Sequence, residues 1–211
     1  MIDLYTWSTP NGRKVSILLE ELGVEYTVYP IDIENGDQFS KKFQQISPDY
    51  KIPVIYDHKD QRYIRESGAI LLYLSHKFGQ FTGTADYHWD VMQWLMWQMS
   101  AIGPILGQAH HFLYYNQGRS PYAEDRFKNE AKKLYGVLNT RLKNFEYISG
   151  PGKGEYSIAD IALWPWISRF QRHQINLDEY PNVYQWYRKI SERPAVKKGY
   201  DIPLSGNKIP T

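Results

Sequence analysis

The chain opens on the stretch Ile2-Asp3-Leu4-Tyr5-Thr6-Trp7-Ser8-Thr9-Pro10-Asn11-Gly12. Residues 2–7 alternate and are rich in β-formers, whereas residues 8–12 are dense in turn and cap residues. Apolar residues then recur at helical spacing from Arg13 to Leu22, and Gly23 stands where a glycine commonly ends a helix. The sequence therefore predicts a strand, a turn and a helix, in that order.

The next segments predict three more strands and a second helix. Tyr26 to Ile33 predicts a strand parallel to the first, because the helical crossover between them is long enough. Lys51 to Asp57 predicts a third strand, entered through a proline, and Arg62 to Arg65 a short fourth one. A helical stripe from Gly68 to Phe78 follows. We therefore expect an α/β domain over residues 1–80 with a mixed four-stranded sheet.

Beyond Thr84 the pattern is helical only, which predicts an all-helical domain over residues 86–200 and a C-terminal tail over residues 201–211. A long tryptophan-rich helix is interrupted at Gly103-Pro104, where we expect a kink. In Ser157-Ile158-Ala159-Asp160 the serine and the aspartate have the spacing of a capping box. The predicted helices are Val91 to Ile102, Pro121 to Phe145, a helix that starts at Ser157, and Pro181 to Arg193.

Composition excludes several classes of protein. The 211 residues carry a formal net charge of only +2, which does not suggest a nucleic-acid partner. The first residues lack the pattern of a signal peptide, and no apolar run reaches the ~20 residues of a membrane helix. We therefore expect a cytoplasmic protein in water, without nucleic acid or membrane as a partner.

The sequence contains no cysteine, which excludes disulfides, thiolate metal sites and a cysteine nucleophile. The pair His110-His111 suggests a metal site at first sight. Adjacent helix residues point in different directions, however, so one helix cannot present both imidazoles to one metal. We predict no metal.

Four motifs follow one another along nearly the whole chain: Thr9-Pro10-Asn11-Gly12, residues 45–53 (QISPDYKIP), Glu66-Ser67-Gly68-Ala69-Ile70 and Gly103-Pro104-Ile105-Leu106-Gly107-Gln108. Together they resemble the glutathione transferase superfamily. Within it they look like the Nu class, which includes bacterial disulfide-bond oxidoreductases and is similar to a yeast nitrogen-regulator group. The resemblance implies a thioredoxin-like N-terminal domain, a C-terminal helical domain and a homodimer. It also implies glutathione as co-substrate, with no permanently bound cofactor.

Glutathione is an anionic tripeptide, so its γ-glutamyl end needs an anion site and an acceptor for its ammonium. Ser67 opens a helix whose free N–H groups favour a carboxylate, and Glu66 would hold the ammonium. The alternative is that Ser67 only caps its helix and that Glu66 is solvated.

The resemblance implies that the bond between Ile52 and Pro53 is cis and that the backbone of Ile52 pairs with the cysteinyl part of glutathione. It also implies that Lys51 contacts the glycyl carboxylate and Gln38 the tripeptide backbone. Without the resemblance, the proline would only mark the entry to a strand and Lys51 would be a surface lysine.

The chemical end of the predicted site is the turn that carries Thr9 and Asn11, where thioredoxin-like relatives place a cysteine. Both side chains offer donors that could hold a glutathione thiolate at the amino end of the helix. Alternatively, Asn11 caps the helix and Thr9 packs in the turn. Tyr5 lies within the strand, so we do not assign it the role of activating the thiol.

Arg126 matches an arginine that the Nu-class pattern places against glutathione. It could instead pair with Glu130 on the same helix.

The sequence thus predicts a glutathione-dependent thiol-disulfide oxidoreductase that uses two external glutathiones and has weak hydroperoxidase activity. One alternative is a glutathione S-transferase that conjugates electrophilic small molecules. Another is a non-catalytic, glutathione-binding regulatory module.

Overall fold

A computed structural model describes residues 1–203, 206 and 208–211 of the chain. The chain forms two compact units. The first contains residues 1–80, 192–209 and 211, and the second contains residues 81–191 and 210. The predicted tail over residues 201–211 falls partly on residues 204, 205 and 207, which lie outside the described part. Residues 192–200, which the sequence analysis grouped with the helical domain, thus pack with the first unit; the predicted domain boundaries themselves stay a prediction.

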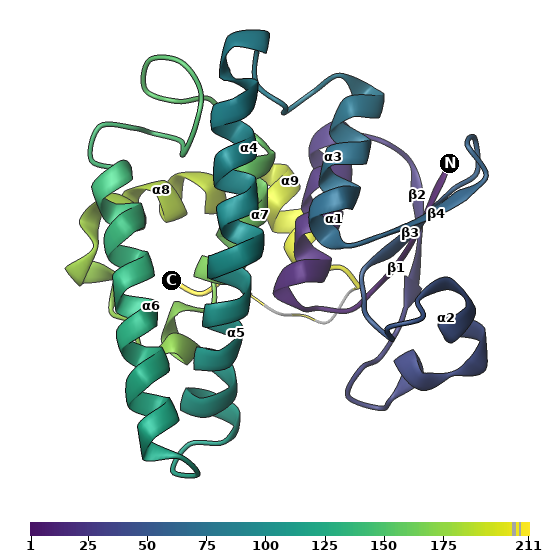
Figure 1. Cartoon of the computed structure of the whole chain (residues 1–211). Coiled ribbons are helices and arrows are strands. Elements are labelled where there is room, and N and C mark those ends of the chain that lie inside the picture. Colours follow the sequence, from purple (N-terminus) through teal and green to yellow (C-terminus); the bar gives the residue numbers. More distant parts are fainter. Residues whose placement is uncertain (204–205, 207) are drawn as a thin grey trace. The chain divides into compact units, whose positions relative to one another are not determined.

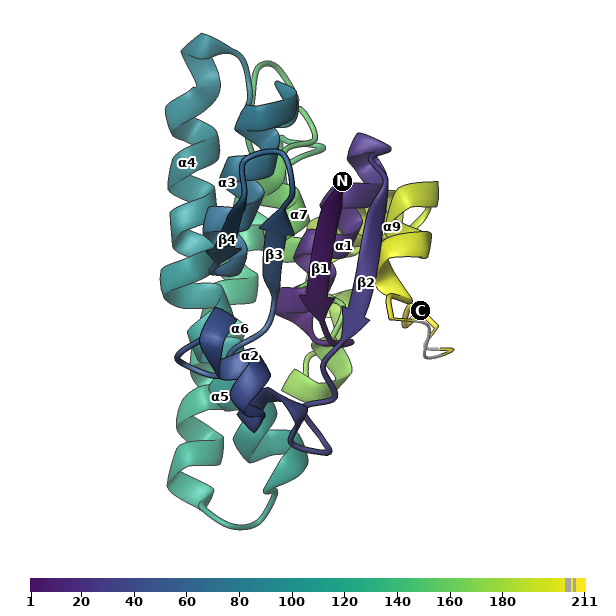
Figure 2. The ribbon, with the colours of Figure 1, turned by 90° about the vertical axis from the view of Figure 1, so that its right-hand side faces the viewer.

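The sheet of the first unit has the strand order β2-β1-β3-β4, as Figure 2 shows. Strands β1 and β2 are parallel, whereas β3 is antiparallel to both β1 and β4. The predicted mixed four-stranded sheet is confirmed. The strands are β1 (Ile2–Thr6), β2 (Tyr26–Pro30), β3 (Val54–Asp57) and β4 (Arg62–Arg65).

The helices of the first unit include α1 (Pro10–Leu22) and α3 (Ser67–Phe78), which pack against each other on one face of the sheet (Figure 1). Leu4 of β1 and Ile55 of β3 are fully buried on that face. The helical turn η1 (Asp37–Phe39) and the helix α2 (Lys41–Ile46) fill the connection between β2 and β3. The helix α2 was not predicted, because one and a half turns give too few apolar repeats to establish a period.

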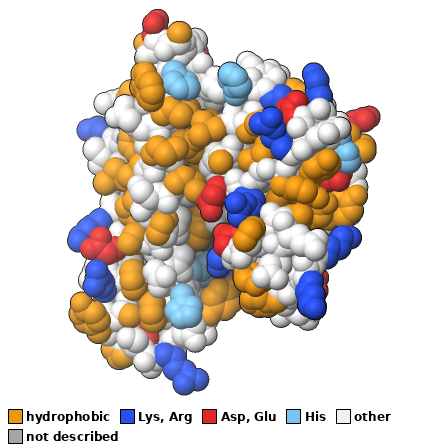
Figure 3. Space-filling model, turned by 45° about the vertical axis from the view of Figure 1, so that its right-hand side comes forward, with side chains coloured by type: hydrophobic (Ala, Val, Ile, Leu, Met, Phe, Trp, Pro, Cys, Tyr) orange, Lys and Arg blue, Asp and Glu red, His pale blue; other side chains and the backbone are white. Residues whose placement is uncertain are grey.

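Tyrosines cover the other face of the sheet. Tyr5 stacks on Tyr29 with ring centroids 4.9 Å apart, and Tyr56 contacts Tyr63 at 4.6 Å. Hydrophobic side chains gather over the strands in Figure 3. Cross-strand register explains the pairs, since β1 places Tyr5 opposite Tyr29, and β3 places Tyr56 opposite Tyr63.

A last helix, α9 (Pro194–Tyr200), packs along α1. The Arg13 Nε donates to the Tyr200 carbonyl at 2.8 Å, and the Ser16 hydroxyl donates to the Gly199 carbonyl at 2.6 Å. A Cβ at Gly199 would lie 2.6 Å from the Cα of Ile17, so only glycine allows this approach. The last predicted helix ends at Arg193, so α9, which is ordered by this packing, was not predicted.

The second unit is helical, as predicted. Its elements are η2 (Ala85–Tyr87), α4 (His88–Trp97), the π-helical turn η3 (Gln98–Ile102), α5 (Gly103–His110), the π-helical turn η4 (His111–Tyr115), α6 (Pro121–Arg141), α7 (Ile158–Ile167), η5 (Phe170–His173), η6 (Leu177–Glu179) and α8 (Pro181–Ser191).

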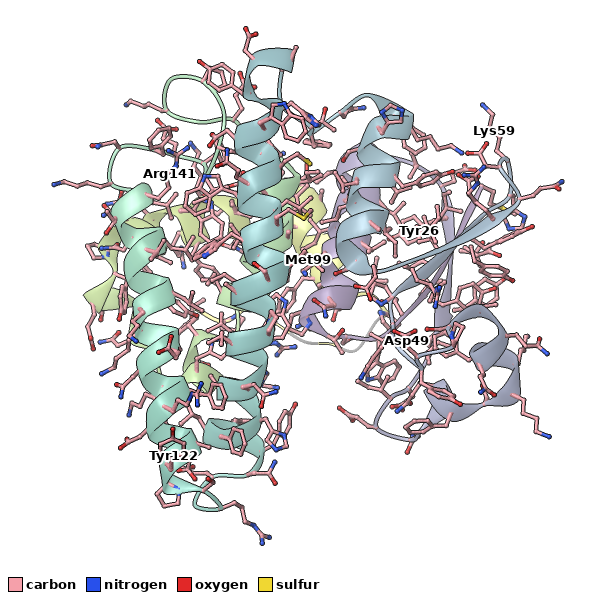
Figure 4. The ribbon with its side chains drawn as sticks, in the orientation of Figure 1. Tyr26, Asp49, Lys59, Met99, Tyr122 and Arg141 are labelled. Carbon is pink, nitrogen blue, oxygen red and sulfur yellow. The ribbon has the colours of Figure 1, made fainter. Side chains whose placement is uncertain are left out.

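The π-helical turn η3 ends where α5 begins at Gly103, with Pro104 in its first turn. The irregular backbone thus lies just before the predicted Gly103-Pro104 interruption. The helix α6 ends at Arg141, four residues earlier than predicted. The Arg141 side chain, labelled in Figure 4, donates to the Asp90 carboxylate at 3.1 Å and lies over the Phe145 ring. These contacts hold the chain after the end of α6.

The predicted capping box at α7 is confirmed. The Ser157 hydroxyl accepts from the Ala159 N–H at 3.2 Å, and the Asp160 carboxylate accepts from the Ser157 N–H at 3.1 Å. Asp160 also accepts from the backbone N–H of Ile148 at 3.0 Å. The box therefore ties the preceding loop to the helix.

Within the part of the chain that the structure describes, no helix has the length and apolar character needed to cross a bilayer. The same residues include no group of three or more His, Cys, Asp or Glu side chains that could hold a metal ion. His110 is buried and His111 exposed, so the two imidazoles do face different surroundings.

Candidate functional site

The turn between β1 and α1 is ordered by Thr9. This residue is the N-cap of α1, and its hydroxyl oxygen accepts from the Gly12 N–H at 3.1 Å. A Cβ at Gly12 would lie 2.3 Å from the Trp7 carbonyl oxygen and 2.5 Å from the Thr6 hydroxyl, so the turn requires glycine there. Thr9, rather than Asn11, therefore caps the helix, which corrects the alternative in which Asn11 did so.

Capping does not use up the Thr9 hydroxyl. A hydroxyl that accepts one hydrogen bond can still donate its own hydrogen. Thr9 and Asn11 are both half-buried, and Asn11 lies in the first turn of α1. The positive end of the helix dipole lies at the same place. The turn can therefore offer two side-chain donors and a helix N-terminus to an anionic sulfur.

Tyr5 belongs to a different surface. Burial, followed by the neighbouring Tyr63, raises the pKa of Tyr5 to about 12. Its ring stacks on Tyr29 on the tyrosine face of the sheet, whereas its neighbours Leu4 and Thr6 are buried beneath the opposite face. A phenol in that position is a poor acceptor for a thiol proton, which agrees with assigning it no part in activating the thiol.

Strand register brings three predicted segments to one end of the sheet. Val54 lies opposite both Tyr5 of β1 and Arg65 of β4. Pro53, which precedes Val54, therefore lies at the end of the sheet where β1 runs into the Thr9 turn. Glu66, which follows Arg65, lies at the same end. The predicted site residues of these three segments thus converge.

Glu66 and Ser67 form the start of α3. Glu66 is the N-cap and has a φ of 66°, an uncommon left-handed conformation for a side-chain-bearing residue. Its side chain is exposed, whereas Ser67 is only 4% exposed. Glu66 makes no side-chain cap hydrogen bond to α3, so simple capping does not account for it.

Lys14 of α1 contacts Ser67 at the start of α3. Its Nζ donates to the Ser67 hydroxyl oxygen at 3.2 Å, and the residue is wholly buried. Burial lowers the pKa of Lys14 to about 7, and the Glu66 carboxylate opposes that shift. Lys14 was not among the predicted site residues. Every residue from Gly12 to Leu19 is buried, including the two basic ones, but this burial exists only in the folded chain and has no local signal in the sequence.

The segment before β3 has the predicted cis bond between Ile52 and Pro53. Lys51 is exposed, and its backbone is fixed by Ser47, whose hydroxyl donates to the Lys51 carbonyl at 2.7 Å. Gln38 is half-buried, and its amide donates to the Ile33 carbonyl at 3.4 Å. The side chain of Gln38 is thus engaged by its own loop in this conformation.

Arg126 lies on α6 of the second unit and is exposed. Its guanidinium lies 5.8 Å from the centroid of the Phe127 ring. Glu130, the alternative partner considered for it, instead accepts from Lys133 at 2.7 Å. The role of Arg126 toward glutathione stays a prediction.

The chain matches known proteins over nearly its whole length. It matches the "Glutathione S-transferase, N-terminal domain" family over residues 4–82 and the "Glutathione S-transferase, C-terminal domain" family over residues 102–194. It is 44% identical over 202 residues to the "Disulfide-bond oxidoreductase YfcG" of Escherichia coli K12, with 93% of each chain covered.

Two solved structures are similar in fold. A glutathione transferase family member from Pseudomonas fluorescens with two glutathiones bound is 40% identical, with a TM-score of 0.86 over 94% of this chain and 92% of that one. A glutathione transferase from Pseudomonas putida with one glutathione disulfide bound per subunit is 38% identical, with a TM-score of 0.89 over 96% and 91% of the two chains.

Proposed function

The chain belongs to the glutathione S-transferase family, and from this premise we propose that it is a glutathione-dependent thiol-disulfide oxidoreductase. The observation that carries the proposal is the Thr9 turn, which joins a helix N-terminus and two polar side chains. The family resemblance implies that thioredoxin-like relatives carry their cysteine in this turn. The similarity to an oxidoreductase named for disulfide bonds supports the choice of reaction.

A chain without cysteine needs two external thiols for this reaction. The thiolate of the first glutathione attacks one sulfur of the substrate disulfide, which forms a mixed disulfide and releases one substrate thiolate. The thiolate of a second glutathione attacks the glutathione sulfur of that mixed disulfide. Oxidised glutathione and the second substrate thiolate leave, and the two substrate thiolates take up the protons that the glutathiones lost.

The protein's task in the first step is to stabilise a thiolate. A free thiol with a pKa near 8.5 is only a few per cent ionised at neutral pH. A hydrogen bond to a charged acceptor contributes roughly 1.5–3 kcal/mol, and one pKa unit corresponds to about 1.36 kcal/mol. One or two donors from Thr9 and Asn11 would therefore bring the thiol pKa to near 7. Further lowering would weaken the nucleophile.

The remaining predicted residues would hold the tripeptide. Ser67 and the N-terminus of α3 would bind the γ-glutamyl carboxylate, and the exposed Glu66 the ammonium. The backbone of Ile52, presented by the bond to Pro53, would pair with the cysteinyl part. Lys51 would contact the glycyl carboxylate and Gln38 the tripeptide backbone, and Arg126 of the helical unit would contact a glutathione.

The test is reduction of a small disulfide by glutathione and the purified protein, coupled to glutathione reductase. Thr9→Ala, Asn11→Ala and Arg126→Ala are assayed beside the unmodified protein, with an aryl halide as a second substrate. Turnover of the disulfide that falls in all three variants supports the proposal. Conjugation of the aryl halide without disulfide reduction would identify a conjugating transferase. Glutathione binding without turnover of either substrate would identify a regulatory module.

We also propose that the protein is a cytoplasmic homodimer, on the strength of the family to which it belongs. Light scattering during gel filtration checks the assembly, because a dimer has twice the 24.9 kDa mass of the chain. Fractionation of cells that express the protein checks the location.

A further inference from the structure

Lys14 is a basic side chain in the interior of the first unit to which the reaction described above gives no task. It is wholly buried, although lysine is almost never fully buried without a specific reason. Its position on α1 is one turn beyond Asn11, and its ammonium group reaches the first residue of α3. Lys14 therefore connects the thiol end of the proposed site with its γ-glutamyl end.

The hydrogen-bonding capacities of the two groups fix their roles. An ammonium can only donate, so a protonated Lys14 makes the Ser67 oxygen an acceptor. The Ser67 hydroxyl hydrogen is then directed to another acceptor. A neutral amine has a lone pair and can take that hydrogen itself. The protonation state of Lys14 thus decides which way the Ser67 hydroxyl donates.

We propose that Lys14 is a positioning residue for glutathione, which in its charged form directs the Ser67 hydroxyl to the γ-glutamyl carboxylate, so that binding of the tripeptide draws a proton onto Lys14. The inference rests on the proposed function, because it assumes a glutathione at Ser67. It adds a component of the anion site that lies beneath the surface.

The electrostatics of the surroundings support this coupling. Burial holds the pKa of Lys14 at about 7, so a large fraction of the side chain is neutral near physiological pH. The N-termini of α1 and α3 both lie close to Lys14, and the partial positive charge at each helix end disfavours a protonated lysine. A ligand carboxylate at Ser67 would offset these effects and raise the pKa of Lys14.

Among the described residues, Glu66 at the start of α3 is a charged group that acts on Lys14, and its carboxylate favours the protonated form. Five other charged side chains on the elements around α1 pair with groups other than Lys14. On α1 and α9 these are Arg13 with the Tyr200 carbonyl, Glu20 with Lys198 and Glu21 with Arg193. On the sheet and α3 they are Asp3 with His58 and Asp57 with Lys77. We therefore assign the coupling between ligand binding and proton uptake to Lys14, with Glu66 as its charged neighbour.

The experiment is calorimetric titration of the full chain with S-methylglutathione at pH 7.5, in buffers that differ in ionisation enthalpy. The thioether has no thiol proton, so thiolate formation cannot contribute to the proton balance. We expect the unmodified protein to take up roughly half a proton or more on binding. Lys14→Met should remove most of that uptake and weaken binding about tenfold or more.

Two further variants separate position from charge. Lys59 lies at the tip of the turn between β3 and β4, and its side chain points away from the sheet in Figure 4. Lys59→Met therefore serves as the matched control and should keep both proton uptake and affinity. Ser67→Ala leaves Lys14 in place but removes the hydroxyl, so it should reduce the uptake as Lys14→Met does. Ser67→Ala also keeps the test open if Lys14→Met does not fold.

Each outcome decides the question. Binding by the unmodified protein without proton uptake overturns the role of Lys14 and leaves the glutathione site standing. Full uptake in Ser67→Ala, or in a folded Lys14→Met, also overturns it. Failure of the unmodified protein to bind S-methylglutathione overturns the proposed function, and the inference about Lys14 with it.

Discussion

The indole N–H of Trp186 donates to Oδ1 of Asp160 at 2.8 Å, and both residues are buried. This bond joins α8 to the capping box of α7. The same carboxylate accepts from the backbone N–H groups of Ile148 and Ser157. One side chain therefore satisfies donors from a loop, a helix start and a second helix.

Asp160→Ala should destabilise the protein strongly. Removal of the carboxylate leaves three buried donors without their acceptor, and each unsatisfied donor costs about 1–3 kcal/mol. We expect the free energy of unfolding to fall by at least about 3 kcal/mol, measured by urea denaturation. Asp178→Ala, at an exposed position, is the control and should change it by less than about 0.5 kcal/mol. A small loss in Asp160→Ala would show that other groups satisfy these donors.

Two glycines should respond in opposite directions to the same substitution. Gly12→Ala places a methyl group against the Trp7 carbonyl and should lower the free energy of unfolding by about 2–3 kcal/mol. The same change should weaken glutathione binding. Gly136→Ala, within α6, has no atom within 4 Å of the new methyl and should add about 1 kcal/mol. Thermal denaturation of both variants measures the contrast. Equal effects would mean that the turn adjusts to the side chain.

The hydrogen bond that the Thr9 hydroxyl donates should affect the pKa of the bound thiol more than the branched shape of the Thr9 side chain does. Thr9→Val keeps the branched side chain but removes the donor, so the pKa of the bound glutathione thiol should rise by about 1–2 units. The lost N-cap should also cost about 1 kcal/mol of stability. Thr9→Ser should keep both properties. The ultraviolet absorbance of the thiolate, followed against pH, gives the thiol pKa. An unchanged value in Thr9→Val would remove Thr9 from the chemistry.

Acid should destabilise the helical unit through His110. Burial, followed by Arg172 and Arg169, lowers the pKa of His110 from 6.5 to about 4. Between these two values the unfolded chain binds a proton there that the folded chain does not, so stability falls as the pH falls. One such group contributes a slope of about 1.4 kcal/mol per pH unit.

The measurement is the melting temperature between pH 7 and pH 4. His110→Gln removes the titrating group and should flatten the decline, whereas His111→Gln, at an exposed position, should not. Buried His173, whose pKa is also lowered by burial, keeps part of the decline in every variant. Identical curves for the two substitutions would contradict this account.

Local signals in the sequence were sufficient for much of the fold. The strand at Ile2, the glycine that ends α1 and the capping box at Ser157 all depend on residues within a few positions of each other. The short helix α9 depends instead on contact with α1, where Gly199 permits a close approach. No pattern within seven residues reports such a distant partner.

The candidate site divides in the same way. Thr9, Asn11, Glu66 and Ser67 could be selected because turns and helix starts have recognisable residue types. Lys14 could not, since a lysine on an amphipathic helix normally faces water. Its burial arises only when α3 packs on α1 and Ser67 meets its ammonium group.

The return of α9 to α1 has a consequence for protein synthesis. The segments that form the sheet, α1 and α3 emerge from the ribosome long before residues 194–200 are synthesised. Until then the surface of α1 that carries Arg13, Ser16 and Ile17 lacks its cover. The N-terminal unit of the nascent chain therefore stays incomplete until the entire helical unit has been synthesised and α9 can pack on α1.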